Sequence, residues 1–198
     1  MGNNVIGFDA PVTGQVSADN PRVVRLNAQA VNRLFMIRDQ LDDAAFAALV
    51  ELLMCHEPLF VRLLGGVGPE GADYAYRGGL FVHSVDIALR LFGSQGLPLE
   101  DKALAVAAGL VRDLGGAGDV DSPVDSALGT VFKLLKEEEP MFAYELGVVL
   151  AGYRHHNTEV ELSKRYARII GELFHADFMS RMQDWGVGSR SEPGRWDH

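Results

Sequence analysis

The sequence predicts an all-α fold, with one domain of about seven to nine helices. Apolar residues recur at helical spacing along most of the chain, and no stretch alternates between apolar and polar residues as a half-buried β-strand does. The chain has 198 residues, of which 47% are hydrophobic, so it can form one substantial core but not two large domains. We therefore expect a single helical bundle that begins with a helical hairpin.

The two ends of the chain differ from its centre in composition. Residues 1–20 lack a steady period and residues 186–198 are polar, so we expect a flexible arm and a polar tail on either side of a domain at residues 21–185. No apolar run approaches the ~20 residues that span a bilayer. The N-terminal segment also lacks the basic start and apolar core of a signal sequence. We expect a cytoplasmic protein that does not bind membranes.

Charge and cysteine content narrow the class of protein further. The net charge of −9 disfavours non-specific attraction to nucleic acid, although a local basic groove stays possible. Cys55 is the only cysteine, so the chain cannot form an internal disulfide. Its place at the end of an apolar helix predicts a small core residue and not a catalytic thiol.

The N-terminal third of the chain predicts three helices. Helical spacing begins at about Leu26, and Asp42 and Asp43 are suited to cap a second helix that ends near Met54. These two helices form the expected hairpin. Leu59–Leu64 predicts a further short helix.

The glycine-rich segment at residues 65–71 is the clearest break in the chain. It lacks the lysine and hydroxyl residues of a phosphate-binding loop, so we interpret it as a connector. The helix at residues 80–92 is so densely apolar that it must be buried on most sides. Residues 98–101 combine a proline with two acidic residues, which favours the start of the helix that carries residues 104–114.

The C-terminal half predicts three more helices. Residues 122–136 and 140–153 each predict a helix that opens with a proline in its first turn. Residues 158–161 form a capping box before the last helix, at about residues 161–185.

The last helix carries an acidic residue close to its apolar side. Its apolar stripe includes Leu173, Phe174 and Phe178, which leaves Asp177 near the inner face. An acidic side chain there needs a partner, so Asp177 is a candidate site residue.

The end of the apolar helix at residues 104–114 organises these candidates. Arg112 and Asp113 follow an apolar run there, and Gly115 stops the helix. Charged groups at the end of a buried helix need partners. Four residues elsewhere in the chain could supply them: His83, His155, His156 and Asp177.

In their order, these residues resemble the motif of the HD superfamily of metal-dependent phosphohydrolases. In that family a histidine in one helix is followed by a His-Asp-x-Gly-Lys run, then by one or two histidines, and then by an aspartate in a late helix. The resemblance covers most of residues 56–184, with Arg112 in place of the motif's first histidine and Gly116 in place of its lysine. The matching positions are His83, Asp113, His155, His156 and Asp177.

The resemblance implies a site in which a divalent ion such as Mn, Fe, Zn or Mg activates a water molecule. It makes His83 and Asp113 the catalytic pair. It also assigns five metal ligands: His83, Asp113, His155, His156 and Asp177.

Arg112 is the departure that decides this chemistry, because a guanidinium has five donors and no acceptor and cannot bind a metal. If Arg112 points inward, its charge takes the place of the cation and it pairs with Asp113 or Asp177. If it points outward, His155 or His156 completes a distorted metal site.

A weaker resemblance is to the HD domain of relaxase-like proteins from conjugative elements. That pattern places two histidines before a Gly-Gly-Leu-Leu-x-His-x-Leu-Glu-Val-Ala run, which is similar to residues 78–88. Here Asp73 and Tyr74 stand where the two histidines are expected.

Two functions follow from these resemblances as hypotheses. The first is a catalytically weak or silent module with a degenerate metal site, which binds an anionic or phosphate-containing ligand through Arg112 or binds a protein partner. The alternative is an active metal-dependent phosphohydrolase that acts on a nucleotide or another phosphoester, including nucleic acid in a conjugative element.

Overall fold

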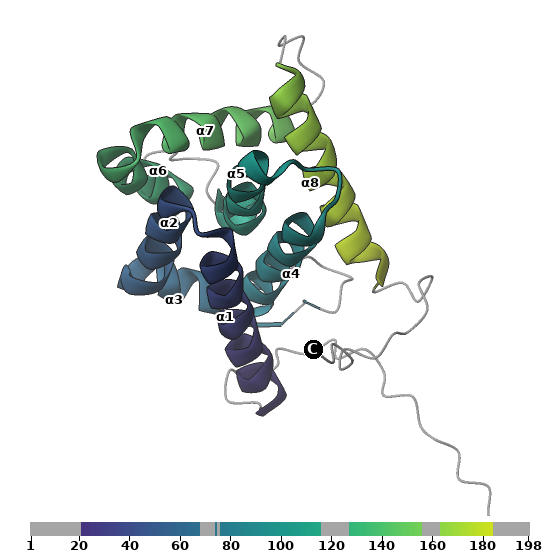
Figure 1. Cartoon of the computed structure of the whole chain (residues 1–198). Helices are drawn as coiled ribbons and strands as arrows, with labels where there is room; N and C mark the ends of the chain where they lie inside the picture. The colour runs from purple at the N-terminus through teal and green to yellow at the C-terminus, as the bar shows by residue number, and fades with distance from the viewer. Residues whose placement is uncertain (1–20, 68–73, 75, 116–126, 156–162, 184–198) are drawn as a thin grey trace, which may run out of the picture.

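The computed structural model describes residues 21–67, 74, 76–115, 127–155 and 163–183 (Figure 1). This part of the chain is all-α, as the sequence predicts, and contains no β-strand beyond an isolated bridge between Val67 and Arg77. Its elements, in order, are α1 (Pro21–Leu41), α2 (Ala44–Cys55), α3 (Glu57–Gly65), α4 (Gly79–Gly93), α5 (Leu99–Val111), the 3₁₀ turn η1 (Arg112–Gly115), α6 (Ala127–Glu138), α7 (Pro140–Arg154) and α8 (Lys164–Gln183).

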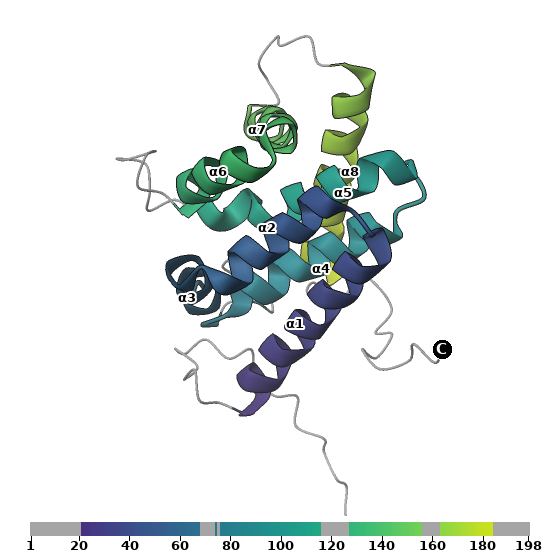
Figure 2. The ribbon, with the colours of Figure 1, turned by 60° about the vertical axis from the view of Figure 1, so that its left-hand side comes forward.

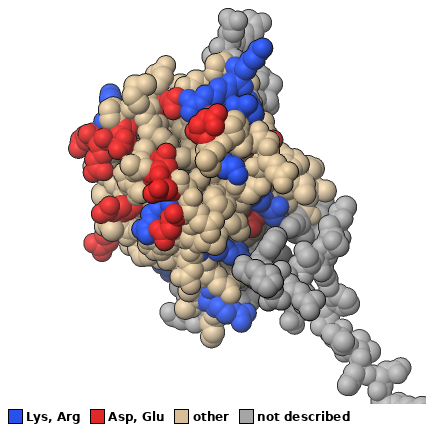
Figure 3. All heavy atoms as spheres, in the orientation of Figure 1, with Lys and Arg blue, Asp and Glu red and all other residues tan. Residues whose placement is uncertain are grey.

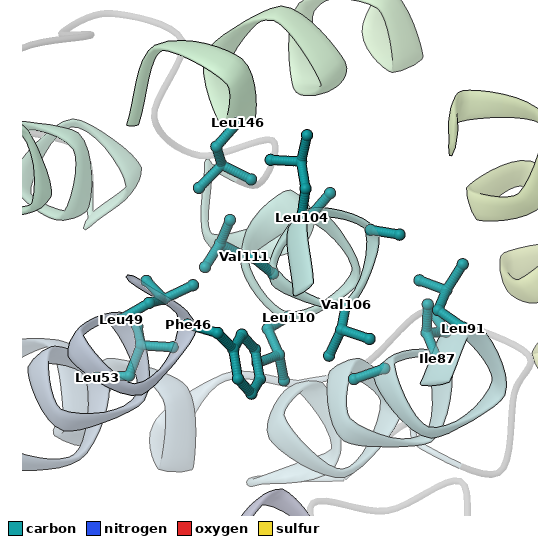
Figure 4. Packing of buried hydrophobic residues seen from close by; sticks show 14 of the residues in the cluster. Phe46, Leu49, Leu53, Ile87, Leu91, Leu104, Val106, Leu110, Val111 and Leu146 are labelled. Carbon is teal, nitrogen blue, oxygen red and sulfur yellow. The ribbon is translucent and has the colours of Figure 1, made fainter. Parts of the chain in front are cut away.

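Helix α5 lies at the centre of the bundle, and α2, α4, α7 and α8 all pack against it (Figure 1). Its residues from Ala103 to Val111 are buried without interruption. A helix that is apolar on every side is stable only when other helices surround it. Figure 4 shows side chains of α5 packed among those of its neighbours: Leu104, Val106, Leu110 and Val111 of α5, Phe46, Leu49 and Leu53 of α2, Ile87 and Leu91 of α4, and Leu146 of α7.

Helices α4 and α5 approach each other closely at Gly109. A Cβ atom at Gly109 would lie 2.8 Å from Cδ1 of Leu91 and 3.1 Å from Cγ2 of Ile87. Because that spacing leaves no room for a side chain, glycine is required at this crossing. The helices run in opposite directions here, so their packing brings Arg112, after the end of α5, beside His83 in the first half of α4.

The predicted N-terminal hairpin is present as α1 and α2, which are joined by a short turn. Asp43 caps α2, since its side chain accepts a hydrogen bond from the backbone N–H of Phe46 at 2.8 Å. Asp42 does not cap the helix; it adopts a positive φ of 49° in the turn. Helix α1 packs more extensively on α4 than on α2, and Figure 2 shows α1 and α4 lying alongside each other.

Three predictions about burial are wrong. Cys55, expected in the core, is exposed, because it is the last residue of α2. Phe174 and Phe178, expected on the apolar stripe of the last helix, are 37% and 58% exposed. The buried side of α8 is set by Ile169, Leu173 and Ala176, and Phe178 lies outside that spacing.

Several predicted features lie outside the described residues. They are the arm at residues 1–20, the tail at residues 186–198, residues 68–71 of the glycine-rich connector, the helix start at residues 122–125 and the capping box at residues 158–161.

Within the described ranges, no single helix is both long enough and apolar enough to cross a membrane. Helices α2 and α3 reach the necessary length and hydropathy only when they are taken together, and they meet at a bend of 78°.

Candidate functional site

Arg112 stands where α5 gives way to the 3₁₀ turn η1. The sequence predicts a regular helix to Leu114, but the α-helix ends at Val111. A tighter turn is common at the end of a helix, where carbonyl groups lose their partners. One of these carbonyls, that of Arg112, accepts a hydrogen bond from Nη2 of Arg154 at 3.2 Å. The turn directs the side chain of Arg112 inward, where it is only 1% exposed.

Three predicted site residues converge on one atom of that side chain. Nη2 of Arg112 lies 2.9 Å from Nε2 of His83, 2.8 Å from Oδ2 of Asp113 and 2.8 Å from Oδ1 of Asp177. Nε2 of His83 is itself 3.6 Å from Asp177 and 3.9 Å from Asp113. The guanidinium therefore occupies the point on which the imidazole and the two carboxylates are directed.

His83 is fully buried in α4, and its neighbours fix its tautomer. Arg112 can only donate, so Nε2 of His83 accepts and the ring proton belongs on Nδ1. Nδ1 then donates to Oγ of Ser180, 3.2 Å away, and Ser180 donates to Oδ2 of Asp86 at 3.1 Å. Asp86 in turn accepts from Nε of Arg90 at 2.9 Å. Every partner role in this chain is satisfied by a neutral imidazole.

Tyr74 packs against the other side of His83. The two ring centroids are 4.8 Å apart, with the rings tilted by 48°. The backbone carbonyl of Tyr74 would lie 1.8 Å from a Cβ atom at Gly79, so only glycine allows this approach at the start of α4. Gly78 before it has a φ of 88°, which also favours glycine. The glycine pair therefore allows Tyr74 to pack against His83.

Asp177 is the most heavily bonded carboxylate of the site. Besides Arg112, it accepts a hydrogen bond from the hydroxyl of Tyr153 at 2.9 Å and one from Nε of Arg181 at 3.1 Å. Burial alone raises the pKa of Asp177, but the charge of Arg112, the hydrogen bond from Tyr153 and the charge of Arg181 outweigh that effect and hold the pKa well below its usual range. Asp177 is therefore an ionised carboxylate at neutral pH.

Arg112 and Tyr153 keep their protons, because their surroundings raise the pKa of each group. Burial lowers the pKa of Arg112, but Asp113 and then Asp177 raise it above its ordinary value. Burial raises the pKa of Tyr153 to about 12, and the hydrogen bond to Asp177 adds to that rise. The site thus holds a cationic guanidinium, two carboxylates and a phenol that donates.

The arrangement does not fit a metal ion. A metal bound to imidazole and carboxylate lies about 2.0–2.2 Å from their atoms, and Nη2 of Arg112 already fills the position that His83, Asp113 and Asp177 share. A fixed positive charge there also opposes any cation. In the part of the chain that the structure describes, no group of three or more His, Cys, Asp or Glu residues is placed to hold a metal.

Of the two later histidines, the structure describes only His155. His155 is exposed just after the end of α7, at its C-cap, and His156 lies outside the described residues. Two site residues were not predicted: Tyr153, which donates to Asp177, and Ser180, which contacts His83. Ser180 follows Asp177 by three positions, so helical spacing places both on one face of α8 and could have identified it.

A second buried charge, which the sequence analysis did not select, lies in the first turn of α5. Asp101 is fully buried and accepts hydrogen bonds from Nε of Arg165 and Nη2 of Arg168, each at 2.6 Å. Arg165 also pairs with Glu145 of α7. The hydrogen bond to Asp101 is the main cause that raises the pKa of Arg165. Asp101 thus fastens the start of α8 to α5 and α7.

Comparison with known proteins adds no relative. No family model matches the chain, and neither the curated proteins nor the solved structures include a match to it.

Proposed function

We propose that the chain is an HD-like binding module in which the guanidinium of Arg112 replaces the metal ion, and that it does not hydrolyse phosphoesters. The observation that carries this proposal is the position of Nη2, within 2.9 Å of His83, Asp113 and Asp177 at once. A permanent cation on the chain balances the carboxylates without a metal. No metal-bound water is then formed, so the site lacks a nucleophile.

The alternative, an active metal-dependent phosphohydrolase, requires Arg112 to leave the site. Its side chain is 1% exposed and bonded to two carboxylates, so moving it to solvent would remove the cation from Asp113 and leave Asp177 with only the half-exposed Arg181 as a charged partner. A nucleic acid substrate, as for a relaxase-like protein, is further disfavoured by the net charge of −9. The silent module is therefore the better supported function.

The choice between an anionic ligand and a protein partner depends on which hydrogen-bond donors of Arg112 remain without a partner. Nη1 is its one buried nitrogen without a hydrogen-bond partner among the described residues. An anion at Nη1 would lie close to Asp113 and Asp177, whose charges repel it. A phosphate-containing ligand is thus the weaker option, and we propose that the module works through protein contacts.

Metal content tests the proposal directly. We expect purified protein to carry far less than one equivalent of manganese, iron, zinc or magnesium. The Arg112→His variant should gain bound metal, because it removes a fixed positive charge and adds a ligand. Elemental analysis measures the content, and added zinc or manganese should raise the melting temperature of the variant but not that of the unmutated protein.

Two controls make the result specific. Arg38→His adds a histidine on the exposed side of α1 and should gain no metal. Asp177→Ala combined with Arg112→His should lose the metal that Arg112→His acquires. A full equivalent of tightly held metal in the unmutated protein, together with hydrolysis of a model phosphodiester that is lost in Asp113→Ala, would refute the silent module.

A further inference from the structure

The outward side of α7 is unusual because it carries no unpaired charge before Arg154, the last residue of the helix. Only Glu145 and Arg154 are charged among the 15 residues of this helix. Glu145 pairs with Arg165, and Arg154 donates to the carbonyl of Arg112. The side chains that remain toward solvent are apolar or phenolic, with Met141 71% exposed and Tyr144 66% exposed. Exposed apolar side chains that lie one turn apart on a helix with few charges favour a contact surface there.

An apolar groove runs along this face, between α7 and α6. Its lining is Phe132, Ala143, Tyr144, Gly147, Val148 and Ala151. Ala143, Gly147 and Ala151 follow each other at intervals of four residues, so they form one row along α7. Because these side chains are small, a second helix can approach the axis of α7 closely along this row.

We propose that α7 pairs in an antiparallel arrangement with α7 of a second copy of this chain, across a twofold axis close to Gly147. Gly147 is midway between Pro140 and Arg154, so a twofold axis there matches the two helices along their full length. In such a contact the same patch serves both copies, and each residue meets its own equivalent or its mirror position. Tyr144 of one copy then lies over the groove beside Gly147 of the other.

The distribution of charge favours a second copy over another partner. A twofold contact brings a patch against its own copy, so a patch with charge of one sign at its centre repels itself, whereas the central face of α7 does not. The ends of the helix are complementary in the antiparallel arrangement. Glu137, Glu138 and Glu139 precede α7, and the exposed Arg154 ends it, so the acidic end of one copy meets the basic end of the other.

Figure 3 shows acidic side chains gathered at the left, where α6 joins α7. The three glutamates there outnumber the two lysines of α6, Lys133 and Lys136. The dipoles of the two antiparallel helices also stabilise this contact, because the negative end of each helix lies beside the positive end of the other. Both effects are strongest when the helices overlap completely, which fixes the axis at Gly147.

The size of the face indicates a weak dimer. A helix of 15 residues is about 22 Å long, and one such face with the wall of α6 buries less than the roughly 800 Å² per partner of a stable interface. We therefore expect a dissociation constant of about 100 µM for the dimer. This inference does not depend on the proposed function.

Sedimentation equilibrium from about 10 µM to 1 mM of the full chain tests the contact around that dissociation constant. The unmutated protein should shift from monomer to dimer, and Tyr144→Glu should weaken the association at least about tenfold, because it buries two like charges. Met141→Glu gives a second variant if the first one fails to fold. Val24→Glu, at an exposed apolar residue of α1, a helix that packs on α2 and α4 on the opposite side of the bundle from α7, should dimerise normally. A protein that is monomeric throughout, or a dimer that survives both α7 variants, overturns the proposal.

Disulfide trapping tests the position of the axis. In a background of Cys55→Ser, Gly147→Cys should form a linked dimer on mild oxidation, since only residues near the axis meet their own equivalents. A Cβ atom at this position lies 3.7 Å from Phe132, an ordinary contact, so the variant should fold. Val24→Cys in the same background is the control, at an exposed residue of α1 on the opposite side of the bundle. Linkage of Gly147→Cys no faster than that of Val24→Cys contradicts the proposed arrangement.

Discussion

Two buried charges hold α8 in place, and their environments are opposite. At Arg112 the cation is buried, and one of its two carboxylates lies toward the surface: the side chain of Asp113 is 30% exposed and that of Asp177 11%. At Asp101 the carboxylate is buried, and its arginines lie toward the surface, with Arg165 38% and Arg168 45% exposed. Arginine and aspartate thus pair in both clusters, but the arginine is the buried partner near the C-terminal end of α8 and the aspartate is the buried partner near its start.

The difference shows which of the two clusters is a site and which is a fastening. The arginines of Asp101 come from one turn of α8, and water can replace either of them. Arg112 is contacted from α4, η1, α7 and α8 together, through His83, Asp113, Tyr153 and Asp177. Convergence of three elements on one nitrogen, with the ring of Tyr153 from a fourth element beside the guanidinium, is the geometry of a binding site, and here the bound group belongs to the chain itself.

The largest expected effect separates the two clusters. Arg112→Met removes the cation and leaves Asp177 buried with less compensation, so we expect a loss of about 3–5 kcal/mol in the free energy of unfolding. Chemical denaturation measures this loss. Asp177→Asn in the same chain should recover part of it, because the two changes remove both members of one ion pair.

The matched control is Arg38→Met, at an exposed pair with Asp39. An exposed ion pair contributes at most about 1 kcal/mol, so this variant should be close to the unmutated protein. If Arg112→Met costs no more than Arg38→Met, the Arg112 cluster does not hold the fold together.

The next effect is the response of the Arg112 cluster to acid. The folded pKa of Asp177 is lower than its unfolded value, which is about 3.9. The carboxylate therefore contributes its full stability above that pH, and the contribution is lost as the pH falls toward the folded pKa. Asp177→Asn should be less stable than the unmutated protein at pH 7, and the gap should narrow below about pH 4. Unfolding free energies of both proteins across this range measure the gap, and a constant gap would contradict the assignment.

Sequence patterns could identify the residues of the Arg112 cluster but not the direction of its central side chain. His83 and Asp177 fall on buried faces of helices whose periods are clear. Arg112 follows the end of α5, where a 3₁₀ turn replaces the helical period, so both inward and outward orientations stayed open. Tyr74 was beyond prediction for a related reason: it lies before α4, and its contact with His83 depends on the glycines after it.

The Asp101 cluster was missed because its partners are far apart in the sequence. Asp101 was assigned to the start of a helix, a role that its position in the first turn of α5 supports. Nothing local indicates that Arg165 and Arg168 reach it from α8. Phe178 was predicted to be buried for a different reason, namely that it is apolar. The buried side of α8 is set by packing on α4, α5 and α7.

The smallest expected effect tests the comparison from the other side. Asp101→Asn keeps the shape of the side chain and leaves two arginines that are already partly hydrated, and Arg165 keeps Glu145 as a partner. We therefore expect a loss of only about 1–2 kcal/mol in the free energy of unfolding, less than that of Arg112→Met. Salt should separate them further. In 1 M salt, where exposed charges are screened over about 3 Å, the cost of Asp101→Asn should shrink, whereas the cost of Arg112→Met should persist because its cation is shielded from ions. Equal costs with equal salt dependence would mean that the two clusters are alike, and that the convergence on Arg112 has no more than a fastening role.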